Sequence, residues 1–239
     1  MSPRASELGS VATDDATKEE TDVAIIGGSL AGSAAAAALA RGGAHVVVLE
    51  KARFPRPRMC GEFLAGSARP HLERLGILQA IIDAGAETIE RFSVVRQDGR
   101  CVEAPLPAPV LSISRQTLDT LVSRAAVDVG AQARFGVTVL SIDGSLEDGF
   151  LLSGPGLRLR ARVVVGAWGR YSPLDGKLGR AFFGTPAPLF GFKKHLVGPG
   201  ADRLLNRVVL HLFPGGYLGL SRVEGGIVNL AALVQPRVA

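Results

Sequence analysis

The sequence predicts an α/β protein in which a mostly parallel sheet is interleaved with an incomplete antiparallel β region. The first observation is a strand, helix and strand pattern, with apolar runs at 22–26 and 45–50 around an alanine-rich segment at 29–41. That order within about thirty residues is typical of a parallel βαβ unit. The second observation is a series of short strand-like segments from Phe190 onward, with few helical signals between them. Because the two kinds of segment alternate, we expect two interleaved domains.

The remaining elements are assigned from periodicity and turn residues. Helices are predicted at 68–75, before Gly76, and at 115–129, where the apolar residues share one face. Hairpins are predicted around Asp98-Gly99 and around Asp143-Gly144, and a proline-rich turn is expected before residue 111. The predicted strands are 22–26, 45–50, 92–96, 100–103, 111–114, 137–142, 149–153, 157–165, 190–197, 207–213, 216–221 and 226–234.

Length and composition describe an ordinary globular chain of 239 residues, with 47% hydrophobic and 21% charged residues. That length can bury one core, or one domain and part of another. The most apolar stretch, 30–40, is too short to cross a bilayer, and residues 1–21 lack the apolar core of a signal peptide. With only Cys60 and Cys101, we expect a cytoplasmic protein without a disulfide framework.

The net charge of +5 does not by itself identify a partner. Basic residues are scattered, and no Lys/Arg run alternates with aromatic residues as in proteins that bind nucleic acid strands. We therefore expect no nucleic acid partner, and a solvated basic surface is the simplest interpretation. A local cluster after the second predicted strand is suited to phosphate groups. Its members are Lys51, Arg53, Arg56 and Arg58.

A glycine-rich loop, Gly27-Gly28-Ser29-Leu30-Ala31-Gly32, lies between the first strand and the first helix, where a dinucleotide site requires it. Gly27 allows the tight turn, and Gly32 lets helix and strand pack closely. The amides that begin the helix are then free to bind a diphosphate. Ser29 replaces the usual middle glycine, which crowds the phosphates slightly, although its hydroxyl can donate to a phosphate oxygen. The predicted ligands are Gly27, Gly28, Ser29, Ala31 and Gly32.

Glu50 ends the second strand, eighteen residues after Gly32. This is close to the spacing at which a carboxylate accepts a hydrogen bond from a ribose hydroxyl. A carboxylate there repels a 2′-phosphate, so FAD or NAD is favoured over NADP. Glu50 and the following Lys51 are therefore predicted cofactor contacts, and together with the loop they indicate a Rossmann-like domain. A glycine turn without a ligand is the alternative.

Four blocks resemble the geranylgeranyl-reductase-like branch of the FAD-dependent oxidoreductases. That branch belongs to the glutathione reductase-2 type superfamily, with the aromatic-ring hydroxylases and flavin halogenases. The blocks are 22–50, 58–64, 115–119 and 165–172. Cys60-Gly61-Glu62 is the most discriminating part of them. The resemblance implies a doubly wound FAD domain with an inserted antiparallel sheet that covers the flavin. The expected division is a disordered leader at 1–20, an FAD-binding domain at 21–92 and 111–180, and an incomplete substrate sheet at 93–110 and 181–239.

The resemblance also implies roles for individual residues. Cys60, Gly61 and Phe63 are expected to line the flavin, Arg115 to reach the cofactor, and Val139 to contact the adenine through its backbone. Because a cysteine at this place lies near flavin and substrate, proton delivery is one role for Cys60. A buried small residue is the alternative for Cys60, and a surface helix residue is the alternative for Arg115.

Three features concern the rest of the expected site. Trp168 and Gly169, also predicted cofactor contacts, stand where hydroxylases have an Asp-Gly pair, and Trp168 cannot act as a carboxylate. Tyr217 is a candidate substrate contact or an ordinary hairpin residue. The Gly-Asp block of the family has no counterpart before Ala239, so the resemblance implies truncation at the C-terminus. His195 and His211 lack acid or cysteine partners at ligand spacing, and no metal site is expected.

The predicted function is an FAD-dependent oxidoreductase that acts on a small apolar substrate of polyketide or isoprenoid type. A reductase or dehydrogenase is favoured over a monooxygenase-like enzyme because of Cys60-Gly61-Glu62 and Trp168, and NAD(P)H is a candidate electron donor. Peripheral membrane contact is expected only for a lipid substrate, and no oligomeric state is predicted. The alternatives are a truncated, inactive flavoprotein fragment that acts as a binding module, and an NAD-binding Rossmann protein without flavin.

Overall fold

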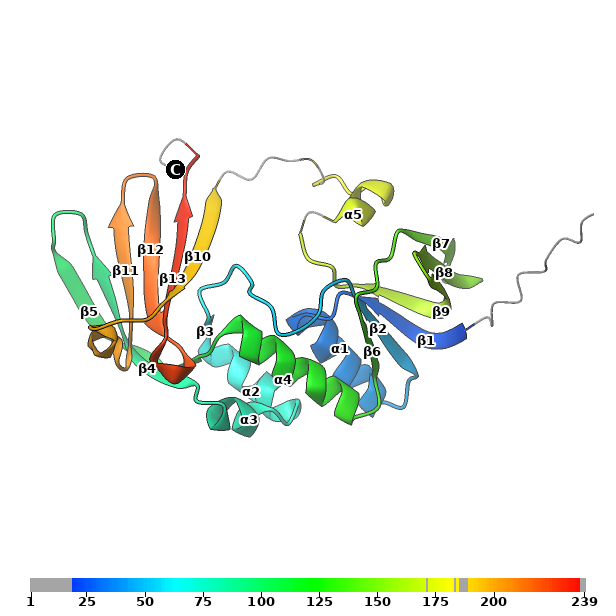
Figure 1. Ribbon diagram of the computed structural model, residues 1–239, viewed down its shortest axis with the longest axis horizontal. Coiled ribbons are helices and arrows are strands. Elements are labelled where there is room, and N and C mark those ends of the chain that lie inside the picture. The colour runs from blue at the N-terminus through cyan, green and yellow to red at the C-terminus, as the bar shows by residue number, and fades with distance from the viewer. Residues whose placement is uncertain (1–18, 171, 183, 185–188, 237–239) are drawn as a thin grey trace, which may run out of the picture.

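The computed structural model describes residues 19–170, 172–182, 184 and 189–236. Within them the chain forms two sheets that lie beside each other, with helices packed between and below them (Figure 1). Of the expected leader at 1–20, residues 1–18 lie outside the described part, whereas Glu19 and Glu20 begin the first strand. No helix of the described ranges is long and apolar enough to span a membrane.

The first sheet has the strand order β6-β2-β1-β9-β8-β7, and its first three pairings are parallel. The strands β8 and β7 extend it by antiparallel pairing. The βαβ unit predicted at the start of the chain is therefore present, as β1, α1 and β2. The elements are β1 Glu19–Ile26, α1 Leu30–Arg41, β2 Val46–Glu50, β6 Gln132–Phe135, β7 Ser141–Ser145, β8 Gly149–Gly154 and β9 Leu157–Gly166.

Both faces of β1 are buried from Val23 to Ile26, which explains the apolar run there. Ile25 packs with small residues of the helices, among them Ala36 of α1 and Ala126 of α4 (Arg115–Asp128). On the opposite face, Ala24 and Ile26 pack with Leu159 and other residues of β2, β8 and β9. The alanine-rich surface of α1 lets it lie close to both the sheet and α4, which holds the end of β1 in place for the site described below.

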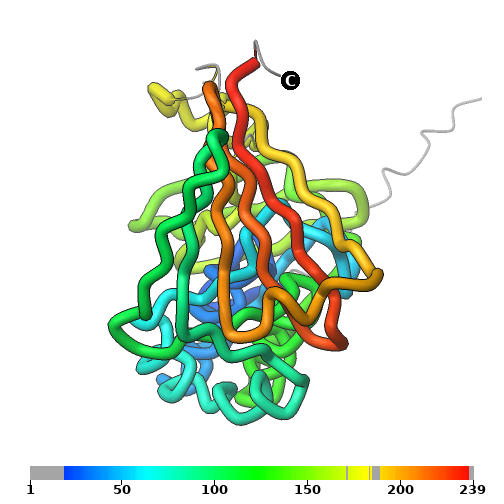
Figure 2. The backbone as a smooth tube through the Cα atoms, turned by 90° about the vertical axis from the view of Figure 1, so that its left-hand side faces the viewer, coloured from blue at the N-terminus to red at the C-terminus, as the bar shows by residue number. Residues whose placement is uncertain are grey.

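The second sheet has the order β10-β13-β12-β11-β4-β5-β3. Figure 2 shows it in front of the rest of the molecule. Its predicted strands are present, but the sheet is not wholly antiparallel, because β11 pairs with β4 in parallel. These two strands are separated in sequence by most of the first sheet, so no hairpin joins them. The strands are β3 Phe63–Leu64, β4 Glu87–Val95, β5 Cys101–Ser112, β10 Phe190–Leu196, β11 Arg207–Phe213, β12 Gly216–Arg222 and β13 Val228–Val234.

Two predicted turns are wrong. The proline-rich segment belongs to β5, and the register shifts from Ile89–Val110 to Arg91–Pro105, so the prolines fall at a bulge where few ladder hydrogen bonds are needed. The hairpin predicted around Asp143-Gly144 is present as β7 and β8, but its turn falls at 146–148 and Gly144 lies inside β7. A Cβ on Gly144 would stand 2.1 Å from the Gly149 carbonyl oxygen, so close strand approach requires the glycine there.

Three short helices and the two sheets complete the described chain. Of the helices, α2 was expected, whereas α3, α5 and the strand β6 had no clear sequence signal. The strands β4 and β5 occupy 87–112 of the second sheet, more than the 93–110 expected for the insertion, and the domain division itself stays a prediction. The helices are α2 Arg69–Arg74, α3 Leu78–Asp83 and α5 Pro173–Lys177.

One carboxylate ties the second sheet to the start of α4. Glu224, between β12 and β13, accepts from the Ser114 amide at 2.8 Å and from the hydroxyls of Ser114 and Thr117 at 2.5 Å. Ser114 is the N-cap of α4. Burial alone would raise the pKa of Glu224, but these hydrogen bonds outweigh it and hold the pKa below its usual value.

The lowered pKa makes this link dependent on pH. A depressed carboxyl pKa adds stability above the unfolded pKa and loses it as pH falls through the folded pKa. We expect Glu224→Gln to lower the free energy of unfolding by about 1–3 kcal/mol at neutral pH. The difference from the wild type should shrink in acid, as measured by denaturant unfolding over a pH series. Glu147→Gln, in the exposed β7–β8 turn, is the control, and a Glu224→Gln difference that stays constant with pH would contradict the assignment.

Candidate functional site

The glycine loop joins β1 to α1 with almost no free space. Gly27 has φ +105°, and a Cβ on it would stand 2.3 Å from the Ala167 carbonyl oxygen after β9. A Cβ on Gly32 would stand 1.7 Å from the Gly27 carbonyl oxygen. Only glycine therefore fits at these two positions. The backbone amides at the start of α1 have no partners within the helix and can bind an anion.

Glu50 lies against this loop and is almost fully buried. Its Oε2 accepts from the Gly28 amide at 2.8 Å, and its Oε1 accepts from the Ala52 amide at 2.9 Å and from Arg56 at 3.1 Å. A carboxylate has about four acceptor positions. Glu50 can therefore hold the loop in shape and still accept from a further hydroxyl.

A cleft of about 240 Å³ opens beside Glu50 at the carboxyl ends of β1, β2 and β9. In open α/β sheets this edge is where ligands bind. Five of the predicted cofactor contacts line the cleft, together with further basic side chains. The predicted contacts are Gly27, Glu50, Lys51, Val139 and Trp168, and the basic residues include Arg58, Arg170 and Lys177.

Trp168 forms part of the wall of this cleft and is fixed by its own partners. Its indole Nε1 donates to Asp175 at 3.1 Å, and the Arg180 guanidinium lies 5.7 Å from the ring centroid. Gly166 must be glycine, because a Cβ there would stand 2.5 Å from the indole. Gly169, with φ +78°, is exposed and does not line the cleft.

Arg115 connects the glycine loop with the segment predicted to face the flavin. Its Nη2 donates to the Ser29 hydroxyl at 2.8 Å and to Asp119 at 3.0 Å, and its backbone amide donates to Glu62 at 2.7 Å. Burial lowers the pKa of Arg115, but Asp119 and Cys60 outweigh it and the net shift is upward. Its side chain is only 15% exposed, which contradicts the surface-helix interpretation.

Ser29 differs from its expected role. Its hydroxyl donates to Asp119 at 2.9 Å while it accepts from Arg115, so the proton expected for a phosphate oxygen is used inside the protein. Ala31 lies exposed in the first turn of α1. The loop thus offers backbone amides, rather than the serine hydroxyl, to an anion.

The residues expected near the flavin lie in the second sheet or in the segment that leads into it. Cys60 is half-buried, and its Sγ accepts from the Glu62 amide at 3.3 Å. Gly61 is exposed, and its carbonyl accepts from Asn229 of β13 at 2.8 Å. Phe63 lies in β3 with 36% of its surface exposed, and Tyr217 lies on β12 with 38% exposed. No described contact joins Tyr217 to Cys60.

Glu62 is the residue that the sequence analysis did not select. It is 2% exposed, has the uncommon φ of +57°, and accepts from the Arg115 amide at 2.7 Å. Lys193 and His195 of β10 also bind its carboxylate. These partners follow Glu62 by more than 130 residues, so no local pattern reveals them. The described residues contain no group of three or more His, Cys, Asp or Glu that could hold a metal ion.

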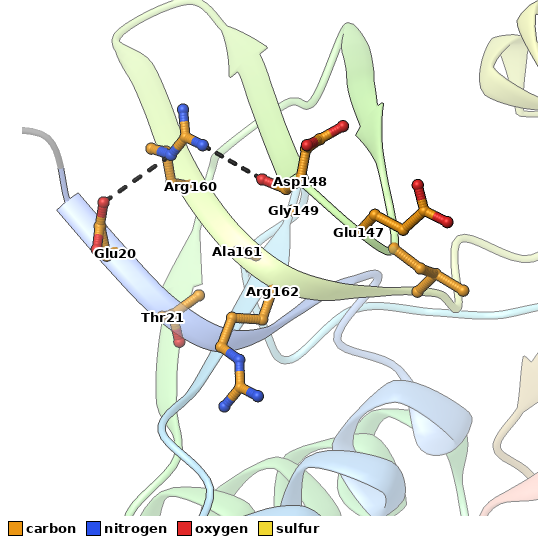
Figure 3. A pocket seen from close by; sticks show the side chains of 9 residues that line it. Glu20, Thr21, Glu147, Asp148, Gly149, Arg160, Ala161 and Arg162 are labelled. Carbon is orange, nitrogen blue, oxygen red and sulfur yellow. Dashed lines mark hydrogen bonds and ion pairs between the residues drawn. The ribbon is translucent and has the colours of Figure 1, made fainter.

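A second hollow, of about 350 Å³, is unrelated to the loop (Figure 3). Its side chains come from the start of β1, the β7–β8 turn and the middle of β9, whereas the glycine loop follows the other end of β1. Arg160 is already paired there, with Glu20 at 3.9 Å and with the Asp148 carbonyl at 3.4 Å. Position and charge therefore separate it from the candidate site.

The fold and the cleft define a dinucleotide-binding α/β module joined to a second β-sheet. The residues fit a cofactor with a diphosphate, because the guanidinium Nε atoms of Arg58 and Arg115 are buried without a hydrogen-bond partner beside the loop. The chain belongs to the family of FAD-binding domains, whose model matches residues 20–193. FAD is accordingly the cofactor, and the alternative of a protein that binds NAD without flavin is disfavoured.

Similar proteins include enzymes of different activities. A menaquinone reductase of Mycobacterium tuberculosis is 33% identical over 169 residues, covering 68% of this chain and 41% of that protein. The 6-methylpretetramide 4-monooxygenase of Streptomyces rimosus is 32% identical over 167 residues, covering 64% and 39%. This chain therefore spans less than half the length of these relatives.

Solved structures share the fold at lower identity. The halogenase PltM in complex with phloroglucinol and FAD has a TM-score of 0.75 and 21% identity, covering 92% of this chain and 52% of that one. A flavoprotein/dehydrogenase from Cytophaga hutchinsonii has a TM-score of 0.77 and 20% identity, covering 92% and 57%. These likenesses concern the fold alone.

The loop geometry makes a direct prediction for Gly32→Ala. The added methyl group cannot fit against the Gly27 carbonyl, so α1 must move away from β1 and the amide cradle must distort. We expect the free energy of unfolding to fall by about 1–3 kcal/mol and FAD binding to be lost, as measured by denaturant unfolding and by FAD titration. Gly198→Ala is the matched control, because a Cβ there meets nothing within 4 Å. Normal FAD affinity in Gly32→Ala would contradict the cradle.

Proposed function

We propose that this chain is the FAD-binding part of an oxidoreductase that reduces or dehydrogenates a small apolar substrate of polyketide or isoprenoid type. The observation that carries the proposal is the position of Arg115. Its guanidinium donates to Ser29 of the glycine loop, and its backbone amide donates at 2.7 Å to Glu62 of the segment predicted to face the flavin. One cation thus lies between the two regions that a single extended dinucleotide has to bridge.

The proposed roles follow the length of the cofactor. The amides of Ser29 to Gly32 and the cations of Arg58 and Arg115 hold the diphosphate, and Glu50 accepts from a ribose hydroxyl. Val139, in the lining of the cleft, contacts the adenine through its backbone. Bound FAD supplies hydride and electron transfer at its ring, while the protein positions the substrate and excludes water.

The second sheet supports an apolar substrate. Directly paired residues of neighbouring strands point to the same face, and the register pairs Ala231 of β13 with Gly219, Leu210 and then Val94. This row lies on the face that carries Lys193 and its contact with Glu62. By their names, two of the relatives act on menaquinone and on 6-methylpretetramide.

A reductase is preferred to a hydroxylase on two grounds. Trp168 occupies the position of the carboxylate in hydroxylases, and its indole is fixed in the wall of the cleft by Asp175. Cys60-Gly61-Glu62 resembles the geranylgeranyl-reductase-like branch. In this proposal NAD(P)H is the electron donor, the second sheet is the substrate domain, and the enzyme is cytoplasmic. The competing proposal of a flavin-binding module without turnover is separated from it by experiment.

The first test is FAD titration of the purified chain, followed by flavin absorbance. We expect Arg115→Gln to weaken FAD binding about tenfold or more, since a charged hydrogen-bonding partner contributes roughly 1.5–3 kcal/mol. Arg124→Gln, exposed on the same helix, is the matched control and should bind FAD normally. A chain that binds no FAD, or an Arg115→Gln variant that matches Arg124→Gln, would contradict the proposed role.

Turnover separates the enzyme from the binding module. We expect the FAD-loaded chain to oxidise NADH or NADPH when an apolar quinone such as menadione is added, and to reduce the quinone without consuming equivalent oxygen. Quinone reduction should be read from its absorbance and oxygen from an electrode. FAD binding without electron transfer would favour the module, and oxygen consumption coupled to product hydroxylation would favour the monooxygenase-like alternative.

A further inference from the structure

The edge strand β10 leaves backbone groups without partners. It is the outermost strand of the second sheet and pairs only with β13 (Figure 2). Among the described residues, no backbone hydrogen bond joins 190–196 to any other segment. In an antiparallel pair, every second residue of an edge strand directs both its N–H and its C=O away from its neighbour. The free side of β10 is therefore a row of donors and acceptors that a further strand can bind.

The opposite side of the same sheet is protected against such pairing. There β3 covers only the end of β5, and the rest of β5 carries Pro105, Pro107 and Pro109, which have no N–H to donate. A register shift in the pairing of β5 with β4 also bends this edge. The strand β10 has no proline and no register shift, and the side chain of Lys193 is only 7% exposed because it binds Glu62. Of the two sides, β10 is therefore the one open to a further strand.

The outer face of β10, the one that turns away from Glu62, carries exposed apolar side chains. Because side chains alternate along a strand, the residues of this face are Phe190, Phe192, Lys194 and Leu196. Phe190 is 59% exposed, Phe192 is 48% exposed and Leu196 is 38% exposed. Three large apolar side chains on one strand at the open edge of a sheet are typical of a surface that is covered in an assembly.

The strand is complementary to a second copy of itself. A two-fold axis perpendicular to the sheet pairs two β10 strands antiparallel and keeps their outer faces on the same side. With the axis at Phe192, the two Phe192 rings lie opposite each other, and each Phe190 lies opposite the partner's Lys194. Aromatic pairs across strands are favourable, and so is a lysine beside an aromatic ring. An axis at Lys193 or at Lys194 would instead place two lysines opposite each other.

The chain leaves room for the second strand. Beside residues 193–195, the edge of β10 borders a hollow of about 350 Å³ that is also lined by Pro57, Arg58 and Gln116. In the pairing centred on Phe192, the partner's Gly191 lies opposite Lys193 on the inner face, so no side chain is added at that point. The partner strand therefore closes the open side of this hollow.

We propose that two copies of this chain pair through β10 and form one continuous sheet across a two-fold axis at Phe192. The partner is a second copy, because one strand supplies both members of each favourable side-chain pair. The assembly places the partner beside Cys60-Gly61-Glu62, since Lys193 and His195 of β10 bind the Glu62 carboxylate. This pairing requires neither FAD nor turnover.

The first test is sedimentation velocity of the purified chain over a concentration series, without and with FAD. We expect an equilibrium between one chain and a species of twice its mass. Phe192→Lys places two lysines opposite each other at the axis and should raise the dissociation constant of the dimer about tenfold or more. Val102→Lys is the matched control, because Val102 is 65% exposed on β5, at the other side of the sheet, and should leave the constant unchanged. Circular dichroism should show the same fold in both variants.

A cysteine probe tests the register without a charged substitution. In a chain with Cys101→Ser, which removes the exposed native thiol, Phe192→Cys should form a disulfide between copies on mild oxidation. Leu196→Cys should not, because an axis at Phe192 keeps the two copies of residue 196 far apart. Linked dimers are read from non-reducing gels. The proposal is overturned if the chain stays a monomer at every concentration, if Phe192→Lys dimerises as well as Val102→Lys, or if Leu196→Cys links as readily as Phe192→Cys.

Discussion

The candidate site depends on one steric constraint, the approach of α1 to the end of β1. The Gly27 carbonyl occupies the space of a side chain on Gly32, and the Ala167 carbonyl occupies that of a side chain on Gly27. The loop from β1 to α1 and the distant segment after β9 thereby meet at one point. This contact fixes the positions of the helix amides, of Glu50 and of Trp168. The shape of the cleft therefore depends on the absence of a Cβ at Gly27 and Gly32.

The start of α4 is the corresponding junction for the second sheet. Its first backbone N–H groups have no partners within the helix, and carboxylates are stabilised there by the helix dipole. Glu62 binds the Arg115 amide and Glu224 binds the Ser114 amide. Both acids come from segments attached to the second sheet. The helix terminus therefore joins the two sheets and directs the Arg115 side chain toward the glycine loop.

Structure that is determined by neighbours in the chain could be predicted from the sequence. The βαβ unit, the main helices and the strands of the second sheet follow from apolar periodicity and from glycine positions. Contacts across long separations could not be predicted in this way. The parallel pairing of β4 with β11, the bulge in β5 and the partners of Glu62 all join segments whose proximity only the folded chain creates. Gly144 shows a related difficulty, because a glycine required for strand approach has the same sequence signature as a glycine in a turn.

This division between local and distant contacts has a functional consequence. The diphosphate cradle is built mainly from one continuous stretch, 22–50, so it can be retained while other parts of the chain change. The surroundings of Cys60 and Glu62 are built from β10, β13 and α4, and a substitution in any of them alters the charge or shape near the proposed substrate site. One fold can therefore serve the reductases, monooxygenases and halogenases that this chain resembles. The chemistry of such proteins therefore depends on the residues around Cys60 and Glu62 rather than on the glycine loop. In this chain those surroundings combine the buried Glu62 with several cations beside an apolar sheet.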